Sequence, residues 1–537
     1  MIKRIFNNTS KTITGAALVL GGASFLSRLI AILRDRIFAH QFGAGSTLDM
    51  YYASFRIPDL VFNLLIVGGI SAGFIPIFTA KLKKDKKGAW GLANNILTIV
   101  GIGIAFVCVL FFIFMPQIIP LIVPGFDAEQ VTQTILLSRI MLFSPFLLGL
   151  SSILNSMLQS MKCFFIYALT PLVYNLGIII GAIFFVPIWG LTGLGFGVIL
   201  GAFFHLTIQI PTLHHHGFQF HPKINLYDKD TLHIGKLMIP RTLTLASNQL
   251  NLFVMTIIAS TLAVGSITVF TFASNLQFVP VGIIGLSFAM AAFPTLSELA
   301  AEKKIDAFRD QIVNTVKKIL FFIIPLSLIF LLLRAQIVRV VLGSGKFDWA
   351  ATIMTADTLA FFTLSLFAQC LTPLLARSFY AMHNTKTPLL IGFVATLISI
   401  IGSLALKDTL GVMGLAIAFS ISAIFQLVAM WFSLRRDLKT LNESIILPSI
   451  YKMIGAGLIM GIAMQFIKTQ LGYMVDMTRF WGIFLQGAIT GIIGLFIYAV
   501  ILLFLRSEEM IHLSQTLKKR WLRIRNVEAG IQEGEQM

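Results

Sequence analysis

The chain has 537 residues, of which 57% are hydrophobic and only 12% are charged. Soluble domains carry about 25% charged residues, so this composition excludes a soluble globular protein and indicates a polytopic helical membrane protein. The net charge of +18 does not indicate a nucleic-acid partner, because most lysines and arginines lie in alternate loops between apolar runs, where such charge sets membrane topology.

Fourteen apolar runs are long enough to cross a bilayer as helices. They lie near residues 13–37, 48–79, 91–115, 131–158, 165–186, 189–211, 233–262, 266–298, 315–342, 351–381, 387–406, 410–433, 447–467 and 480–505. The even-numbered gaps between them hold most of the positive charge, as at Lys83, Arg309 and Arg436. The positive-inside rule therefore predicts that both termini are cytoplasmic.

Two pairs of similar segments indicate an internal repeat. Pro76 and Pro294 end similar stretches 218 positions apart, and the hairpins that end at Pro171 and Pro388 are 217 positions apart. This offset spans six helices, so the two halves share one orientation in the membrane. Coincidence is the alternative, since small and aromatic residues recur easily in membrane helices. We expect two six-helix lobes around a central cavity, followed by two extra helices.

The repeat and the loops predict six segments along the chain. After the last span, apolar residues recur at helical spacing among lysines and arginines, which predicts a basic amphipathic helix on the inner leaflet, with a disordered acidic end. The predicted segments are the N-terminal lobe (1–212), a cytoplasmic linker (213–232), the C-terminal lobe (233–434), a cytoplasmic loop (435–446), two lipid-groove helices (447–505), and the basic helix and tail (506–537).

The stretch from 22 to 76 carries charged residues inside two apolar runs. They are Arg28, Arg34, Asp35, Arg36, Asp49, Arg56 and Asp59. A charge at membrane depth costs roughly 2.5–3.5 kcal/mol, so such residues face a bundle interior or a watered cavity. Seven residues turn through about 700° of helix, so Arg28 shares a face with Asp35, and Asp49 shares one with Arg56. A net positive charge remains, which favours an anion pathway over charges that only hold helices together.

Motifs for covalent, metal or nucleotide chemistry are absent from the sequence. The three cysteines, Cys108, Cys163 and Cys370, have neither disulfide nor metal-ligand spacing. There is no P-loop, HExxH or GxSxG motif, so we expect a protein that is not an enzyme and has no cofactor or metal. The histidines at 214–216 are expected to lie in a solvated linker. An enzyme and a non-transporting scaffold stay open as alternatives.

Several short motifs resemble one known family. They are Ser27–Arg28, Arg34–Asp35, residues 42–45, Asp49, residues 55–58, residues 74–76, residues 124–126, residues 292–297, residues 345–347 and residues 384–388. Together they resemble MurJ (MviN), the lipid II flippase family of the multidrug/oligosaccharidyl-lipid/polysaccharide exporter superfamily. The resemblance implies fourteen helices in two lobes, with the last two helices shaping a lipid-facing groove.

The resemblance also implies a function and a site. Members move undecaprenyl-pyrophosphate-linked peptidoglycan precursor from the inner to the outer leaflet, and alternating access of the two lobes would do so here. Arg28 and Arg34 match the family's essential cavity arginines, and Asp49 matches its acidic partner. With Asp35 and Arg56 they form the expected substrate site, because an arginine fork suits a pyrophosphate.

The sequence departs from the family at positions that bear on the substrate. Many members carry two arginines and a glutamate where this chain has Phe62, Asn63 and Val67, and an arginine where it has Asn275, which we include in the expected site. These changes leave open another polyprenyl-pyrophosphate glycan as substrate, or an anion site shifted to Arg56 or Arg241. A cation antiporter is a further alternative, although such a carrier needs buried carboxylates without arginine neighbours.

The resemblance finally implies partners and a location. The expected partners are lipid II, membrane lipids and the peptidoglycan synthesis machinery, with no nucleic acid and a monomeric state. The expected location is the bacterial cytoplasmic membrane. Outward movement would draw on the membrane potential, on an ion gradient or on removal of product, since nothing in the chain hydrolyses nucleotide.

Overall fold

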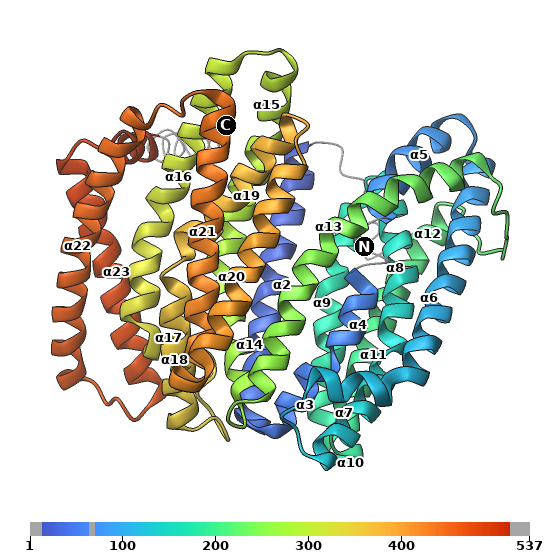
Figure 1. Ribbon diagram of the computed structural model, residues 1–537, viewed down its shortest axis with the longest axis horizontal. Helices are drawn as coiled ribbons and strands as arrows, with labels where there is room; N and C mark the ends of the chain where they lie inside the picture. The colour runs from blue at the N-terminus through green and yellow to red at the C-terminus, as the bar shows by residue number, and fades with distance from the viewer. Residues whose placement is uncertain (1–12, 64–69, 516–537) are drawn as a thin grey trace, which may run out of the picture. The chain divides into compact units, whose positions relative to one another are not determined.

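The computed structural model describes residues 13–63 and 70–515, with side chains throughout these ranges except at 13–21, 24, 25, 70–72 and 237–248. Every regular element in these ranges is a helix (Figure 1). Ten helical segments there are long and apolar enough to cross a membrane, and the bent pair of α18 (Trp349–Thr363) and α19 (Leu366–Ala381) would make an eleventh. The predicted all-α polytopic membrane fold is therefore confirmed. The runs near 13–37, 48–79 and 233–262 include residues outside the described part.

The chain divides into two compact units. The first comprises Met1–Phe272, Val341–Met354 and Ser399–Leu415. Its helices are α2 (Ile13–Phe42), α3 (Ser46–Ser54), α4 (Arg56–Phe62), α5 (Ile70–Lys84), α6 (Lys86–Ile122), α7 (Ala128–Met141), α8 (Phe143–Ser160), α9 (Phe164–Ile180), η2 (Gly181–Phe185), α10 (Val186–Trp189), α11 (Thr192–Thr207), α12 (Ile210–His215), α13 (Lys229–Ser260) and the start of α14 (Ser266–Pro280).

The second unit comprises Ala273–Val340, Thr355–Ile398 and Ala416–Met537. Its helices include the rest of α14, then η3 (Val281–Leu286), α15 (Ser287–Ala301), α16 (Ile305–Leu332), α17 (Arg334–Val341), α18, α19, α20 (Lys386–Leu410), α21 (Val412–Leu438), α22 (Glu443–Met474) and α23 (Phe480–Phe504). Several helices contribute residues to both units, and the predicted lobe boundaries stay a prediction. The predicted basic helix begins within the described part, but residues 516–537 lie outside it.

Three predicted spans are broken by a single residue: the run 131–158 at Leu142, between α7 and α8, and two runs in which another helix bonds at the break. The run 48–79 is interrupted at Phe55, between α3 and α4, and the run 315–342 at Leu333, between α16 and α17. At each of these last two breaks another helix donates to a backbone carbonyl. The Ser138 hydroxyl donates to the carbonyl of Ser54 at 3.3 Å, and the Lys468 ammonium donates to that of Leu332 at 3.1 Å. Such partners allow a helix to break at membrane depth.

Helices α9 and α11 pack through glycine, with no side chain between their backbones. A Cβ added at Gly177 would lie 2.3 Å from Cα of Gly201, and one at Gly181 would lie 2.3 Å from Cα of Gly197. Each helix thus presents two glycines four positions apart, a spacing that lets membrane helices approach closely. Helix α9 also packs against α2, so the glycine contact supports the helix that carries Arg28, Arg34 and Asp35.

The two hairpins that indicated the repeat have the same backbone geometry. Between α8 and α9, Lys162 has φ of 61°, and between α19 and α20, His383 has φ of 59°. The next residue closes each turn with the same backbone hydrogen bond. The N–H of Cys163 donates to the carbonyl of Leu158, and the N–H of Asn384 donates to the carbonyl of Phe379, both at 2.9 Å. The same closure follows α15 at Lys303 and α23 at Arg506, so it is a common helix ending here and the duplication stays a prediction.

Candidate functional site

The guanidinium of Arg34 on α2 is held in place from two directions. Its Nε and Nη2 donate to Oδ1 of Asp35 at 3.1 and 2.8 Å, and its Nη1 donates to Oδ1 of Asn175 on α9 at 3.0 Å. Asn175 is oriented in turn by donating to the carbonyl of Pro171. A guanidinium has five N–H donors, so these three bonds leave two. The Arg34 side chain is 20% exposed, so a ligand can reach it.

Two polar atoms of α3 and α4 are buried without a hydrogen-bond partner. They are Nε of Arg56 and Oη of Tyr52. Arg56 interacts electrostatically with Asp59, and Tyr52 with Arg34, so both orphan atoms lie beside charged groups. An unsatisfied buried donor costs about 1–3 kcal/mol, and in a native protein such a donor calls for a functional explanation. An acceptor-rich anion would satisfy both atoms.

Asp49 bonds to the N-terminus of α14. Its Oδ2 accepts from the backbone N–H of Gly265 at 2.6 Å, and its Oδ1 accepts from the backbone N–H of Thr268 at 2.8 Å and its hydroxyl at 2.6 Å. A carboxylate is favourable there because the first N–H groups of a helix are unsatisfied and the helix dipole is positive. The sequence paired Asp49 with Arg56 on one helical face. The break at Phe55 puts them on different helices, and Asp49 bonds to α14 instead.

Further contacts join the same end of the first unit. The backbone N–H of Lys346 donates to the carbonyl of His40 at 2.9 Å, and the Arg36 guanidinium donates to that of Val341 at 3.4 Å. Gly345, at φ of +57°, lets the chain pass His40, because a Cβ there would lie 2.3 Å from its carbonyl oxygen. The loops after α2, α13 and α17 therefore meet at this end, which we call the Asp49 cluster.

The remaining predicted site residues lie in different places. Arg28 is half-buried on α2, six residues before Arg34, and its predicted pairing with Asp35 stays a prediction. Asn275 is exposed on α14, in the part of that helix that belongs to the second unit. The side chain of Arg241 and the whole of Val67 lie outside the described part.

An apolar groove runs along α22 in the second unit. One section, of about 590 Å³, lies among α16, α19, α21 and α22, from Glu443 to Leu458. A second section, of about 570 Å³, continues between α16 and α22 as far as Gln470. The two sections share Leu328 and Leu458, so together they follow most of the length of α22. Of the two helices predicted to shape a lipid-facing groove, α22 lines both sections and α23 lines neither, and the lipid-facing role stays a prediction.

The sequence reasoning missed three partners of the predicted residues. Asn175 orients Arg34, and Gly265 and Thr268 bind Asp49. Asn175 could have been noticed, because it is a polar side chain inside the apolar run 165–186 and such residues are often functional. Nothing marks Thr268, because threonine is common at helix starts.

Solved structures with this fold are membrane transporters. The protein called "Lipid II flippase MurJ, inward closed conformation" superposes with a TM-score of 0.75 at 24% identity, covering 91% of this chain and 99% of that one. A multidrug resistance MATE family transporter of the MOP superfamily superposes with a TM-score of 0.67 at 17% identity, covering 80% and 99%. The chain thus shares its fold with these two transporters.

The family follows from the sequence match. The profile of the family described as lipid II flippase MurJ matches residues 38–485, and the chain belongs to this family. The probable lipid II flippase MurJ of Rickettsia prowazekii is 27% identical over 419 residues, 78% of this chain and 82% of the relative. That of Treponema pallidum is 25% identical over 450 residues, 81% and 84%. The resemblance inferred from the motifs is confirmed.

Proposed function

We propose that this protein moves lipid II from the inner to the outer leaflet of the bacterial cytoplasmic membrane by alternating access. Its relatives are named as probable lipid II flippases, and it shares their family over most of its length. The predicted cytoplasmic termini and monomeric state belong to the same proposal, as does work beside the peptidoglycan synthesis machinery.

The observation that carries the proposal is the unsatisfied donor capacity around Arg34 and Arg56. Arg34 keeps two N–H donors, and the buried Nε of Arg56 has no partner. A pyrophosphate offers many acceptor oxygens in a geometry that arginine forks match. Arg28, on the same helix as Arg34, would add a third cation, while Asp35 orients the fork and limits the net charge.

The apolar groove along α22 suits the polyprenyl tail. Its first section is lined almost wholly by apolar side chains, so it would take hydrocarbon and not a glycan. The tail could then stay in or beside the bilayer while only the head group crosses the polar interior. This division removes the cost of drawing a long hydrocarbon through a watered cavity.

The Asp49 cluster supports alternating access. By the predicted topology it lies at the outer end of the helices, and it joins α3, from the predicted N-terminal lobe, to α14, from the predicted C-terminal lobe. A few backbone and carboxylate bonds can form in one state and break in another at modest cost. We propose that these bonds close the outer end while the substrate enters from the cytoplasmic side.

The test is complementation of a bacterium depleted of its own flippase, with lipid II exposure measured by an externally added enzyme that cleaves it. We expect Arg34→Ala and Arg56→Ala to abolish complementation and lipid II exposure, while the amount of protein in the membrane stays normal. Arg139→Ala is the matched control, because Arg139 is a half-buried arginine of α7 that donates to the carbonyl of Phe112, away from Arg34 and Arg56 in the sequence. Full rescue by both site variants would refute the assignment.

A related substrate is the second candidate, because this chain has Asn275 where many family members carry an arginine. The head group of another polyprenyl-pyrophosphate glycan would keep the anion and lose the peptide. Native mass spectrometry of the protein purified from its own membranes separates the two, since a muropeptide-bearing lipid supports lipid II and a peptide-free glycan lipid supports the second candidate.

A further inference from the structure

A pocket of about 440 Å³ lies between the C-terminal helix and α15–α16, all within the second unit. The C-terminal helix starts at residue 508, after α23, and its predicted place is the cytoplasmic surface. The pocket is far along the chain from the Arg34 site and does not share a lining residue with the groove along α22. Its volume is within the usual range for a small-ligand site.

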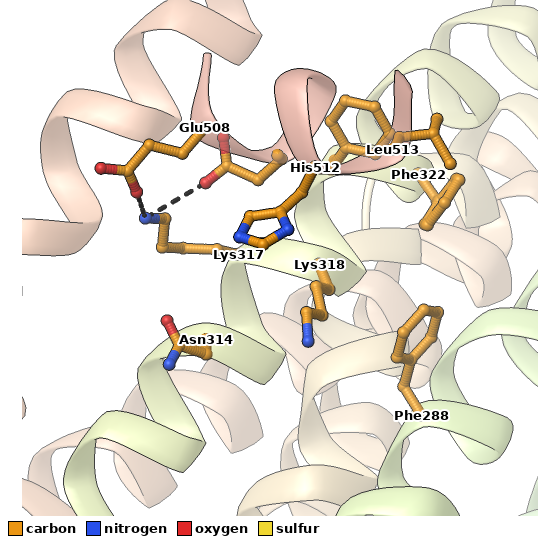
Figure 2. A pocket seen from close by; sticks show the side chains of 10 residues that line it. Phe288, Asn314, Lys317, Lys318, Phe322, Glu508, His512 and Leu513 are labelled. Atoms are coloured by element: carbon orange, nitrogen blue, oxygen red, sulfur yellow. Dashed lines mark hydrogen bonds and ion pairs between the residues drawn. The ribbon is translucent and has the colours of Figure 1, made fainter. Parts of the chain in front are cut away.

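One side of the pocket holds three charged groups with a negative sum. The ammonium of Lys317 lies 2.8 Å from Oε2 of Glu508 and 3.2 Å from Oε1 of Glu509 (Figure 2). Lys317 and Glu509 are buried, with 6% and 7% of their side chains exposed, whereas Glu508 is 77% exposed. Two carboxylates against one ammonium leave one negative charge, and the open Glu508 presents it to a ligand.

The other side of the pocket is cationic and aromatic. Lys318 extends away from Glu508 towards the part of the pocket that holds Phe288 (Figure 2). Phe288 and Phe322 stack there with their ring centroids 6.0 Å apart, and Leu513 of the C-terminal helix adds apolar surface. Phe321 also lines the pocket and meets Phe322 edge to face, with ring centroids 5.0 Å apart.

We propose that this pocket binds a zwitterionic phospholipid whose head group carries a primary ammonium. Its phosphate would lie at Lys318, its ammonium would donate to Glu508, and the first part of its acyl chains would cover Phe288 and Phe322. Separated charges that sum to zero complement a zwitterion better than an anion. A primary ammonium donates hydrogen bonds to a carboxylate, whereas a quaternary ammonium has no N–H group to donate.

The test measures binding of three lipids of equal chain length to the purified full-length protein by native mass spectrometry. The lipids are phosphatidylethanolamine, phosphatidylcholine and phosphatidylglycerol. We expect wild-type protein to bind phosphatidylethanolamine about fivefold more tightly than either of the others, the size of one solvent-accessible charge pair. Equal binding of the three lipids would overturn the proposal.

Two variants separate the two ends of the pocket. Lys318→Gln should weaken the binding of all three lipids about fivefold, because it removes the partner of the phosphate that they share. Glu508→Gln should weaken the binding of phosphatidylethanolamine only. In this variant Lys317 keeps Glu509 as its partner, so the pocket should stay folded. Lys386→Gln, at an exposed lysine of α20 outside the pocket, should change nothing. Unaltered binding by both pocket variants would overturn the proposal, as would displacement of the lipid by an equal concentration of soluble glycerophosphoethanolamine.

Discussion

The hydroxyl of Thr268 donates to Oδ1 of Asp49 at 2.6 Å, and its backbone N–H donates to the same oxygen at 2.8 Å. A single carboxylate oxygen thus fixes the first turn of α14, while the other oxygen binds Gly265. Both side chains are buried, at 4% and 0% exposure. The bonds are charge-assisted and shielded from water, so each is worth more than an exposed one.

This arrangement predicts a graded series of variants. Thr268→Ser keeps the hydroxyl and should leave thermal stability in detergent unchanged. Thr268→Val loses only the hydroxyl bond, at a cost of about 1.5 kcal/mol, and Asp49→Asn loses the charge on all three bonds, at about 3 kcal/mol. Thermal unfolding checks the order. Equal unfolding temperatures for Asp49→Asn and wild type would show that the bonds do not stabilise this conformation.

The shape of the Arg34 contacts predicts that a lysine cannot replace this arginine. One ammonium cannot reach both Asp35 and Asn175 and still offer donors to a pyrophosphate in the same plane. We expect Arg34→Lys to lose most lipid II exposure at the cell surface, by at least about tenfold, although its charge is kept. Asn175→Ala should cause a smaller loss, since Asp35 still holds two donors. Wild-type exposure with Arg34→Lys would mean that charge alone suffices.

The glycine contact of α9 with α11 predicts a packing defect. Gly181→Ala places a methyl group 2.3 Å from Cα of Gly197, so the helices must separate, at a cost of about 1–3 kcal/mol for overpacking. Gly455→Ala is the control, because nothing lies within 4 Å of its added Cβ. The temperature of thermal unfolding should fall for Gly181→Ala and should stay level or rise for Gly455→Ala. An equal change of unfolding temperature in the two variants would mean that the backbones at Gly181 and Gly197 are not in close contact.

The docking of the C-terminal helix should depend on pH through Glu509. Burial tends to raise the pKa of Glu509, but the Ser507 hydroxyl and the Lys317 ammonium outweigh it, and the pKa lies below its ordinary value of 4.5. With a folded-state pKa below the unfolded one, the stabilisation is full above 4.5 and is lost as pH falls through the folded-state value.

A spin label at Gln515→Cys measures this docking. We expect the label to become mobile on acidification below pH 4.5. Glu509→Gln should make it mobile at neutral pH already and should remove most of the pH dependence. A label whose mobility does not change between pH 7 and the acid range would argue against the Lys317 ion pairs as the docking force.

The excess of arginine over carboxylate in α2–α4 predicts a dependence on membrane potential. Moving one charge through 100 mV is worth about 2.3 kcal/mol. An inside-negative potential favours outward movement of an anionic head group and draws the empty, positively charged site back. Collapsing the potential with an ionophore at constant pH and sodium should therefore stop lipid II exposure. Continued exposure would indicate an ion gradient or removal of product as the energy source.

The sequence predicted the helices and the charged stretch well because both are local signals. Hydropathy located the spans, and the cost of a membrane charge marked Arg34 and Asp49 as candidate site residues, a role that stays a prediction. The breaks at Phe55 and Leu333 were not predicted, because each depends on a donor from another helix, Ser138 or Lys468.

The partners of the predicted site residues were also beyond local signals. Asn175 lies 141 positions from Arg34, and Thr268 lies 219 positions from Asp49. Pairing over such distances is decided by how helices pack and not by spacing along one face. The shared helical face of Asp49 and Arg56 therefore gave no sign that Asp49 bonds to α14.

The ion pairs of Lys317 decide where the chain can be shortened. A truncation after Phe504 removes the basic tail, but it also removes Glu508 and Glu509 and leaves a 5%-exposed ammonium without either carboxylate. A buried charge that loses its partners costs about 3–5 kcal/mol. A truncation placed after Gln515 spares the ion pairs, so that any loss of function then reports on the tail itself. A reporter protein fused at the same point would likewise leave the fold intact.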